Sequence, residues 1–199
     1  MIIVGAGGLG IEILGILIND DYSGEICFFD ENKEHNSLLF NKYRVYSDPI
    51  FLKKHLINND NNFVTGIGNP RIREKVSRKI ISLGGKLAHI ISKNVSIFSN
   101  IKISDGTIIQ PGVGMSHGIE MGDSLAIHLN ATIGHATKIG KYVNIGPNSS
   151  IIGPTEICDY AYIGAQSVVL PGLRIGKQAI IPAGSRVDCD VPDYSTYPI

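Results

Sequence analysis

The spacing of hydrophobic residues divides the chain into two segments with different periods. In residues 1–92, short apolar runs alternate with helical patterns, in which hydrophobic residues recur on one face. Strands are expected at residues 2–4, 25–29, 63–67 and 87–91, and helices at residues 11–19, 49–56 and 71–83. This alternation predicts a Rossmann-like βαβ domain, which is a small parallel sheet with helices on its faces.

From Val95 the hydrophobic period changes to six residues, and it holds without an insertion. Sixteen consecutive positions at this spacing are Ile, Val or Met. They are Ile97, Ile103, Ile109, Met115, Met121, Ile127, Ile133, Ile139, Ile145, Ile151, Ile157, Ile163, Val169, Ile175, Ile181 and Val187. Such a hexapeptide repeat is typical of a parallel β-helix, in which three hexads close one triangular coil. We therefore predict an all-β parallel β-helix at residues 93–199, with a short C-terminal tail.

The repeated side chains are expected to point inward and to stack on their equivalents in the next coil, about 4.8 Å away. At roughly 1.5–3 kcal/mol for each buried side chain, they would form the core of this domain. Glycines follow several of these positions, and we expect them at corners where a positive φ is useful. They are Gly134, Gly140, Gly146, Gly164 and Gly176.

Charge and hydrophobicity argue against nucleic-acid-binding, membrane and secreted proteins. The 18 basic and 18 acidic residues cancel, so we expect no binding to nucleic acid and no electrostatic attraction to an anionic membrane. The longest apolar run, residues 11–18, is too short for membrane insertion and contains Glu12. The N-terminus carries neither the basic segment nor the cleavage site of a signal peptide. A cytoplasmic protein is therefore expected.

The three cysteines, Cys27, Cys158 and Cys189, have no CxxC spacing. This argues against a disulfide framework and against a zinc site, so we expect no metal. We interpret all three as small buried hydrophobic residues in a reducing compartment.

A glycine-rich turn connects the first strand to the first helix. Gly5, Gly7 and Gly10 fit the dinucleotide-binding fingerprint, with Asp30 twenty residues later. Residues 1–90 are about half the size of a full dinucleotide-binding fold, which favours a nucleotide sugar over NAD. The helix N-terminal amides would then lie near the pyrophosphate or the sugar, and Asp30 or Glu31 near the base or the ribose. The alternative is that the glycines only permit tight packing of strand against helix.

A second turn, Gly66-Ile-Gly-Asn-Pro70, ends a strand and opens a helix. Gly68 and Asn69 are expected to line the same pocket, and an ordinary helix cap with Asn69 at the N-cap is also consistent with the sequence. The basic residues of this helix are interpreted as mostly its solvated face, and no function is assigned to them. They are Arg71, Arg73, Lys75, Arg78 and Lys79.

His135 follows the glycine of its hexad, so its side chain is expected to point outward from the prism. A neutral imidazole there suits a general base that accepts the proton of an attacking amine. The backbone N–H of Gly153, one coil above, is a candidate oxyanion donor. Alternatively, His135 is a turn residue at a solvated corner. His117, 18 residues earlier, is expected to stack beneath it, and His128 to lie close to the same corner.

The two domains in this order resemble the bacterial nucleotide-sugar N-acetyltransferases of the PglD type and their relatives, the NeuD-type sialic acid O-acetyltransferases. The resemblance is carried by the glycine-rich turn at residues 5–10, Phe29-Asp30-Glu31, Gly66-Ile-Gly-Asn-Pro70 and Ile133-Gly-His135. It implies a left-handed β-helix and a homotrimer with its active sites, and acetyl-CoA, between neighbouring subunits. It also implies His135 as the catalytic base and a nucleotide-linked amino sugar held partly by the N-terminal domain.

The resemblance also assigns binding residues. Those for the substrate are Gly7, Gly8, Leu9, Asp30, Glu31, Gly68 and His128, and those for the coenzyme are Asn144, Gly153, Ala165 and Ala183. The chain departs from the family pattern at three of its positions: Leu9 and Asn144 each replace a histidine, and Ala136 replaces the acidic residue that follows the base. The Gly-x-Pro-Ala segment that usually ends these enzymes is also missing.

The leading interpretation is an acetyl-CoA-dependent N-acetyltransferase of a nucleotide-linked amino sugar, a 4-amino-4,6-dideoxyhexose for surface glycan biosynthesis. Two alternatives stay open. One is a sugar O-acetyltransferase of the sialic acid type. The other is a non-catalytic β-helix that assembles with a glycan enzyme, which Ala136 and Asn144 would favour.

Overall fold

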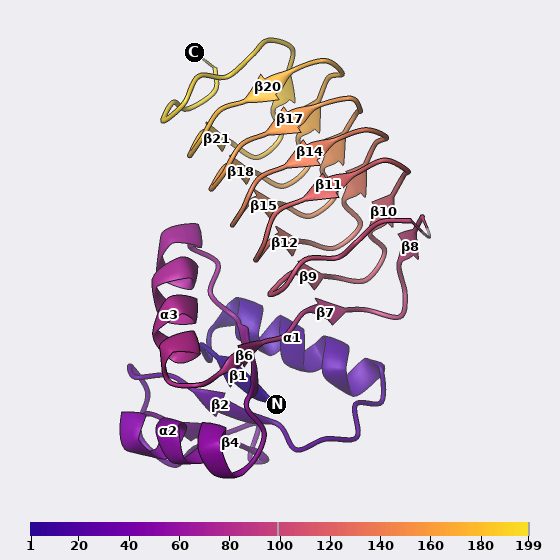
Figure 1. The fold of residues 1–199 in the computed structure, drawn as a ribbon. Coiled ribbons are helices and arrows are strands. Elements are labelled where there is room, and N and C mark those ends of the chain that lie inside the picture. The colour runs from indigo at the N-terminus through magenta and orange to yellow at the C-terminus, as the bar shows by residue number, and fades with distance from the viewer. Residues whose placement is uncertain (99, 199) are drawn as a thin grey trace. The chain divides into compact units, whose positions relative to one another are not determined.

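The computed structural model describes residues 1–98 and 100–198. The chain divides into two compact units, Met1–Ile90 and Ile91–Ile199. Figure 1 shows a helix-covered sheet in the first unit and a stack of coils in the second. The division falls two residues before the boundary expected from the sequence.

The first unit is built on a six-stranded sheet with the order β3-β4-β2-β1-β5-β6. Its strands are β1 (Ile2–Val4), β2 (Cys27–Phe29), β3 (Ser37–Leu39), β4 (Tyr43–Tyr46), β5 (Asn62–Thr65) and β6 (Lys86–Leu87). All neighbouring strands are parallel except β3, which runs antiparallel to β4. The chain continues from β1 to β2 on one side and later places β5 on the other. In such sheets ligands bind outside the carboxyl ends of the strands where the order reverses. We call the adjacent carboxyl ends of β1 and β5, with the loops that follow them, the switch point.

Three helices connect these strands: α1 (Gly8–Asn19), α2 (Pro49–Asn58) and α3 (Pro70–Ser82). Proline at the first position and an aspartate or asparagine cap begin both α2 and α3, as helix-capping preferences require. The predicted Rossmann-like domain is confirmed. Strands β3 and β4 were not predicted, because residues 37–46 show no regular alternation and are interrupted by a turn at residues 40–42.

The second unit is a parallel β-helix of three sheets, as predicted. Sheet B contains β7 (Ile90–Ile91), β9 (Ile108–Ile109), β12 (Ala126–Ile127), β15 (Asn144–Ile145), β18 (Tyr162–Ile163) and β21 (Ile180–Ile181). Sheet C contains β8 (Ser96–Ile97), β10 (Gly114–Met115), β13 (Thr132–Ile133), β16 (Ser150–Ile151), β19 (Val168–Val169) and β22 (Arg186–Val187). Sheet D contains β11 (Glu120–Met121), β14 (Lys138–Ile139), β17 (Glu156–Ile157) and β20 (Arg174–Ile175). The predicted strand Leu87–Ile91 is thus divided, because β6 belongs to the first sheet and β7 to sheet B.

The register follows the hexapeptide period. Met115 pairs with Ile133, which pairs with Ile151, so each inward side chain lies on its equivalent one coil away. Most of the sixteen predicted positions are buried in one continuous core. Ile97, Ile103 and Met121, all in the first coils, are partly buried and pack against that core.

A second column of mostly buried residues lies two positions before the inward aliphatic residues. It contains small or hydroxyl-bearing side chains such as Thr137, Ser149 and Ala161. Several of their hydroxyls donate to backbone carbonyls at the corners, for example Thr137 to Gly134 and Ser149 to Gly164, each at 2.8 Å. These hydrogen bonds satisfy polar groups that would otherwise be costly to bury.

The expected role of the corner glycines is wrong. Gly134, Gly140, Gly146, Gly164 and Gly176 do not have positive φ. The left-handed residue instead comes two positions later, and at several corners it is not glycine: Ala136, Tyr142, Asn148, Gln166 and Gln178 have φ between 51° and 58°. The glycines are needed because a Cβ there would collide with the next coil, as at Gly146, where it would lie 2.6 Å from the Ala165 nitrogen.

The expected burial of the cysteines is correct only for Cys27, which is buried on β2. Cys158 is partly exposed at a corner after β17, and Cys189 is exposed near the C-terminus. In the described ranges 1–98 and 100–198, the model contains no helix with both the length and the hydrophobicity that a membrane crossing requires.

Candidate functional site

His135 lies at the corner between sheets C and D, where the chain passes from β13 to β14. Its side chain is exposed, as predicted from its place in the hexad. The ring of His117 stacks against it, with centroids 5.7 Å apart and planes inclined by 19°. Phe98 meets the other side of His117 edge-on, with centroids 5.9 Å apart. Three rings from successive coils therefore form one column, and His135 is its last member.

Gly153 lies one coil above His135 at the same corner. A Cβ atom at position 153 would collide with the His135 backbone, so only glycine fits in this conformation. Both residues line a groove of about 430 Å³ on the outer face of sheet C. The strand residues that point outward into this groove are small, namely Ser96, Thr132 and Ser150, and Gly114 has no side chain, whereas the exposed Ile152 borders it after β16. No acidic residue is among the described residues that line this groove, in keeping with Ala136 in place of an acid.

Two of the four residues assigned to the coenzyme, Ala165 and Ala183, lie at a different corner. Ala165 follows β18 and Ala183 follows β21, so both lie between sheets B and C. Both are accessible, Ala183 the more so. Gly153 is therefore separated from these two alanines by the full width of sheet C.

His128 also belongs to the corner between sheets B and C, because it follows β12. The expectation that it lies at the corner of His135 is therefore wrong. The hexad phase contained this information, since residue 128 is seven positions from 135 and so belongs to the preceding side of the prism. Asn144, on β15, is buried with 2% of its surface exposed.

At the switch point the glycines divide into two groups. Gly5, Gly10 and Gly66 pack against one another, and a Cβ at Gly66 would lie 2.5 Å from the Gly10 Cα. This group serves the close packing of strand and helix. By contrast, a Cβ at Gly7 or Gly8 would meet no atom within 4 Å.

Gly68 belongs with this second group, because a Cβ there would also meet nothing within 4 Å. Gly7 is the N-cap of α1, and no side chain caps that helix. The glycines predicted to face the substrate are thus the ones that packing does not require.

Asp30 and Glu31 follow β2 beside the glycine-rich turn. The Asp30 carboxylate accepts hydrogen bonds from the N–H groups of Ala6 and Asn32, each at 3.0 Å. It therefore holds the first turn in place. Glu31 forms an ion pair with Lys79 of α3, at 2.6 Å. The side chain of Leu9 is buried, with 9% of its surface exposed, so it faces the core of the domain.

Arg73 is an exception to the interpretation of the basic residues of α3 as mostly its solvated face. Its side chain is completely buried, and one guanidinium nitrogen donates to the carbonyl oxygens of Ile67 at 2.9 Å and Gly68 at 3.2 Å. Sequence reasoning missed it because charge was given more weight than position. Arg73 occurs with Ser77 and Ile80 on the buried face of α3, at the spacing of an inward helical stripe.

Comparisons with known proteins address both halves of the chain. Residues 1–80 match the PglD N-terminal domain, and residues 136–171 match the bacterial transferase hexapeptide, six repeats. The chain joins a PglD N-terminal domain to a hexapeptide-repeat domain. The resemblance inferred from the motifs is thereby confirmed.

Several solved structures share the fold of this chain. WeeI from Acinetobacter baumannii is 26% identical, with 98% of this chain and 94% of that chain covered and a TM-score of 0.91. A variant of perosamine N-acetyltransferase from Caulobacter crescentus, in complex with CoA and GDP-perosamine, is 23% identical (98% and 91% covered, TM-score 0.90). The acetyltransferase domain of PglB from Neisseria gonorrhoeae, with acetyl coenzyme A, is 24% identical (98% and 93% covered, TM-score 0.88). No curated protein matches the sequence.

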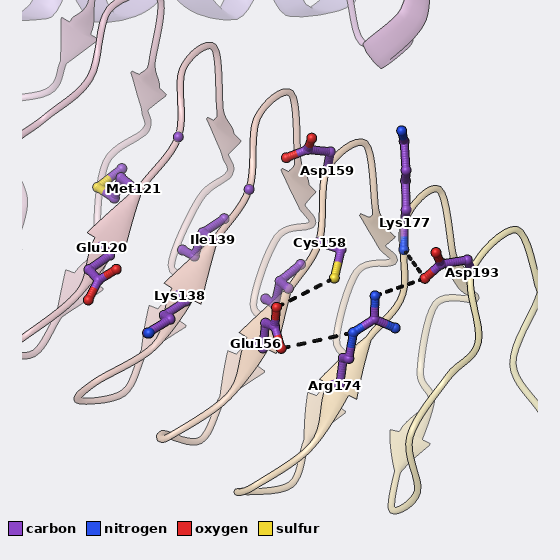
Figure 2. Close-up of a pocket in the computed structure, with 13 residues that line it drawn as sticks. Glu120, Met121, Lys138, Ile139, Glu156, Cys158, Asp159, Arg174, Lys177 and Asp193 are labelled. Carbon is purple, nitrogen blue, oxygen red and sulfur yellow. Dashed lines mark hydrogen bonds and ion pairs between the residues drawn. The ribbon is translucent and has the colours of Figure 1, made fainter.

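The hexapeptide-repeat domain has a further groove, of about 510 Å³, along sheet D (Figure 2). The outward residues of its four strands alternate in charge: Glu120, Lys138, Glu156 and Arg174. Glu156 lies 3.9 Å from Arg174, which also pairs with Asp193 at 3.0 Å. Opposite charges on neighbouring strands stabilise a sheet, so we interpret this groove as structural. None of the predicted site residues lines it.

Proposed function

We propose that this protein is an acetyl-CoA-dependent N-acetyltransferase that acts on a nucleotide-linked amino sugar, a 4-amino-4,6-dideoxyhexose, in surface glycan biosynthesis. The observation that carries the proposal is the corner of His135. An accessible imidazole borders a groove of small side chains, and the backbone of Gly153 packs directly above it. A perosamine N-acetyltransferase of the same fold binds CoA and GDP-perosamine, which supports this choice of substrates.

In the proposed reaction, the sugar amine attacks the thioester carbonyl carbon of acetyl-CoA. His135 accepts the amine proton, and the N–H of Gly153 stabilises the oxyanion of the tetrahedral intermediate. The C–N bond is then complete, the C–S bond breaks, and the imidazolium returns the proton to the CoA thiolate. The stacked ring of His117 would orient the base where a family acid is replaced by Ala136.

We propose direct transfer, without an acyl-enzyme. Ser116 and Ser150 also line the groove, which the sequence reading did not recognise, and the Ser150 hydroxyl lies 3.2 Å from that of Thr132. Under direct transfer neither serine forms a bond with the acetyl group. Ser116→Ala and Ser150→Ala should therefore retain most of the activity.

The separation of the predicted residues supports a site shared by two copies of the chain. His135 and Gly153 lie at one edge of sheet C, and Ala165 and Ala183 at the other. We propose that the edge with His135 and Gly153 in one copy meets the edge with Ala165 and Ala183 in the next copy. All four residues would then border the same acetyl-CoA. Such a head-to-tail contact gives a ring when the rotation between copies closes, and the homotrimer that we propose is a ring of this kind. Small side chains at 165 and 183 would leave room for the pantetheine arm of the coenzyme.

The nucleotide is assigned to the switch point, with Gly7, Gly8 and Gly68 facing the ligand and Asp30 and Glu31 beside it. A helix N-terminus with exposed glycines suits a diphosphate. Both proposed substrates are cytoplasmic metabolites, so we propose a cytoplasmic enzyme.

The proposal is tested by following thiol release from acetyl-CoA with a panel of UDP-, dTDP- and GDP-linked amino and hydroxy sugars. We expect turnover with an amino sugar and a loss of at least about 100-fold in His135→Ala. His89→Ala replaces an exposed histidine that is not among the residues lining the groove, and it should behave as wild type. Turnover only with a hydroxyl acceptor would establish the O-acetyltransferase, and absence of turnover with every acceptor would favour a non-catalytic assembly role.

A further inference from the structure

Arg73 occupies an unusual place in the PglD N-terminal domain, because it is a charged residue with none of its surface exposed. Burial of a guanidinium is costly unless hydrogen bonds compensate it. An aliphatic side chain at this point of the inward stripe of α3 would fill the same space without that cost. The position of the charge, directly behind the loop that follows β5, therefore needs a reason beyond packing.

The contacts of Arg73 fix the orientation of two successive peptide groups. Its guanidinium holds the carbonyl oxygens of Ile67 and Gly68 toward the interior of the domain. In a planar trans peptide the C=O and N–H groups point in opposite directions. The N–H groups of Gly68 and Asn69, which belong to the same two peptide units, are therefore directed away from Arg73.

The rest of this loop leaves that side open for a ligand. Gly68 has no side chain, and a Cβ there would meet no atom within 4 Å. The Asn69 side chain turns to α3, where its oxygen accepts from the N–H groups of Arg71 at 3.0 Å and Ile72 at 3.2 Å. The amides of Gly68 and Asn69 thus lie at the positive end of a helix, with a permanent cation behind them.

We propose that Arg73 is a positioning residue of the nucleotide site. It holds the loop so that the N–H groups of Gly68 and Asn69 donate to the diphosphate of the nucleotide-linked sugar. This inference rests on the proposed function, since it takes the switch point as the place where the nucleotide binds. Asp30, which follows β2, has a similar role for the first loop, because its carboxylate accepts a hydrogen bond from the Ala6 N–H.

The test uses the full chain and three probes, UDP, dTDP and GDP, in calorimetric titrations. Wild type should bind at least one of them. For that probe, Arg73→Met should raise the Kd by about 10- to 100-fold, because charge-assisted hydrogen bonds hold the loop. The Kd for acetyl-CoA should stay within twofold of wild type. Arg78→Met, on the exposed side of the same helix, is the matched control and should leave both constants unchanged.

A spectroscopic measurement separates positioning from general damage. In wild type, the amide resonances of Gly68 and Asn69 should shift on addition of the bound nucleoside diphosphate. In Arg73→Met these two shifts should be lost. If Arg73→Met does not fold, Arg73→Lys is measured instead, because lysine keeps the positive charge but lacks the planar set of guanidinium donors. The Kd of Arg73→Lys should rise by at least about threefold.

The outcomes distinguish the inference from the function on which it rests. A wild-type protein that binds none of the three diphosphates contradicts both. A wild-type protein that binds one, together with a folded Arg73 variant of the same affinity and the same amide shifts, contradicts only the role of Arg73.

Discussion

The backbone of Gly153 packs so closely against that of His135 that a methyl group at position 153 would collide with the His135 carbonyl oxygen. The two residues come from successive coils at one corner of the β-helix. This contact fixes the position of the His135 backbone, from which the imidazole projects. It therefore also fixes the proposed oxyanion donor, the Gly153 N–H, relative to the proposed base. It also makes the distance between them sensitive to a single added carbon.

We therefore expect Gly153→Ala to lower kcat by at least about 10-fold, because displacements of about 1 Å near reacting groups are costly to catalysis. Thermal unfolding should show a moderate loss of stability. Gly15→Ala is the control, since a Cβ at this position in α1 meets no atom within 4 Å. Alanine there should raise stability slightly and leave kcat unchanged. Wild-type kcat in folded Gly153→Ala would show that this contact has no catalytic role.

The alternating charges of sheet D should stabilise the β-helix. Glu156 lies between Lys138 and Arg174 on neighbouring strands (Figure 2). Glu156→Lys would place three cations in succession, and we expect it to lower the free energy of unfolding by about 1 kcal/mol. Thermal denaturation at low and at high salt measures this effect. Because exposed charges are screened, the difference should shrink at 1 M salt. A difference that is absent at low salt would contradict the structural interpretation of this groove.

The three cysteines should differ in their reaction with a thiol reagent. Burial raises the pKa of the Cys27 thiol to about 11, so little thiolate forms at neutral pH. Burial also raises the pKa of Cys158, which is partly exposed, and Cys189 is exposed. Alkylation at pH 7.5, followed by peptide mass spectrometry, should modify Cys189 first and Cys27 only on unfolding. Rapid modification of Cys27 in the native protein would contradict its place in the core.

Much of the fold could be predicted from the sequence because it depends on strict periodicity. One aliphatic residue in every hexad must point into the prism, and Ile133, Ile151 and Val169 do so in register. The second inward column was not predicted because it contains polar residues such as Thr137 and Ser149, which a hydrophobic pattern does not include. Their burial depends on hydroxyl hydrogen bonds to corner carbonyls, which appear only once the coil has closed.

The errors at the site have a similar cause. Close approach of coils, rather than positive φ, requires glycine at 134 and 146, and only the stacked structure shows which atoms approach. Arg73 was interpreted as a surface residue because its partners are backbone carbonyls, which no sequence motif marks. His128 was placed at the wrong corner although its hexad phase was available.

The stack of His117 on His135 followed directly from their spacing of three hexads. What the sequence alone does not decide is how the two edges of sheet C share a substrate. His135 lies at one edge and Ala183 at the other, so the proposed site needs both edges at one ligand.

Subunit mixing tests this claim most directly. His135→Ala removes the proposed base, and Ala183→Trp should block the coenzyme at the other edge, so each variant refolded alone should be inactive. After refolding as a one-to-one mixture, about a quarter of the interfaces in a head-to-tail ring should combine an intact His135 with an intact Ala183. We predict that thiol release from acetyl-CoA returns to about a quarter of the wild-type rate. A mixture that stays inactive, although native mass spectrometry shows mixed oligomers, would contradict a site shared between copies.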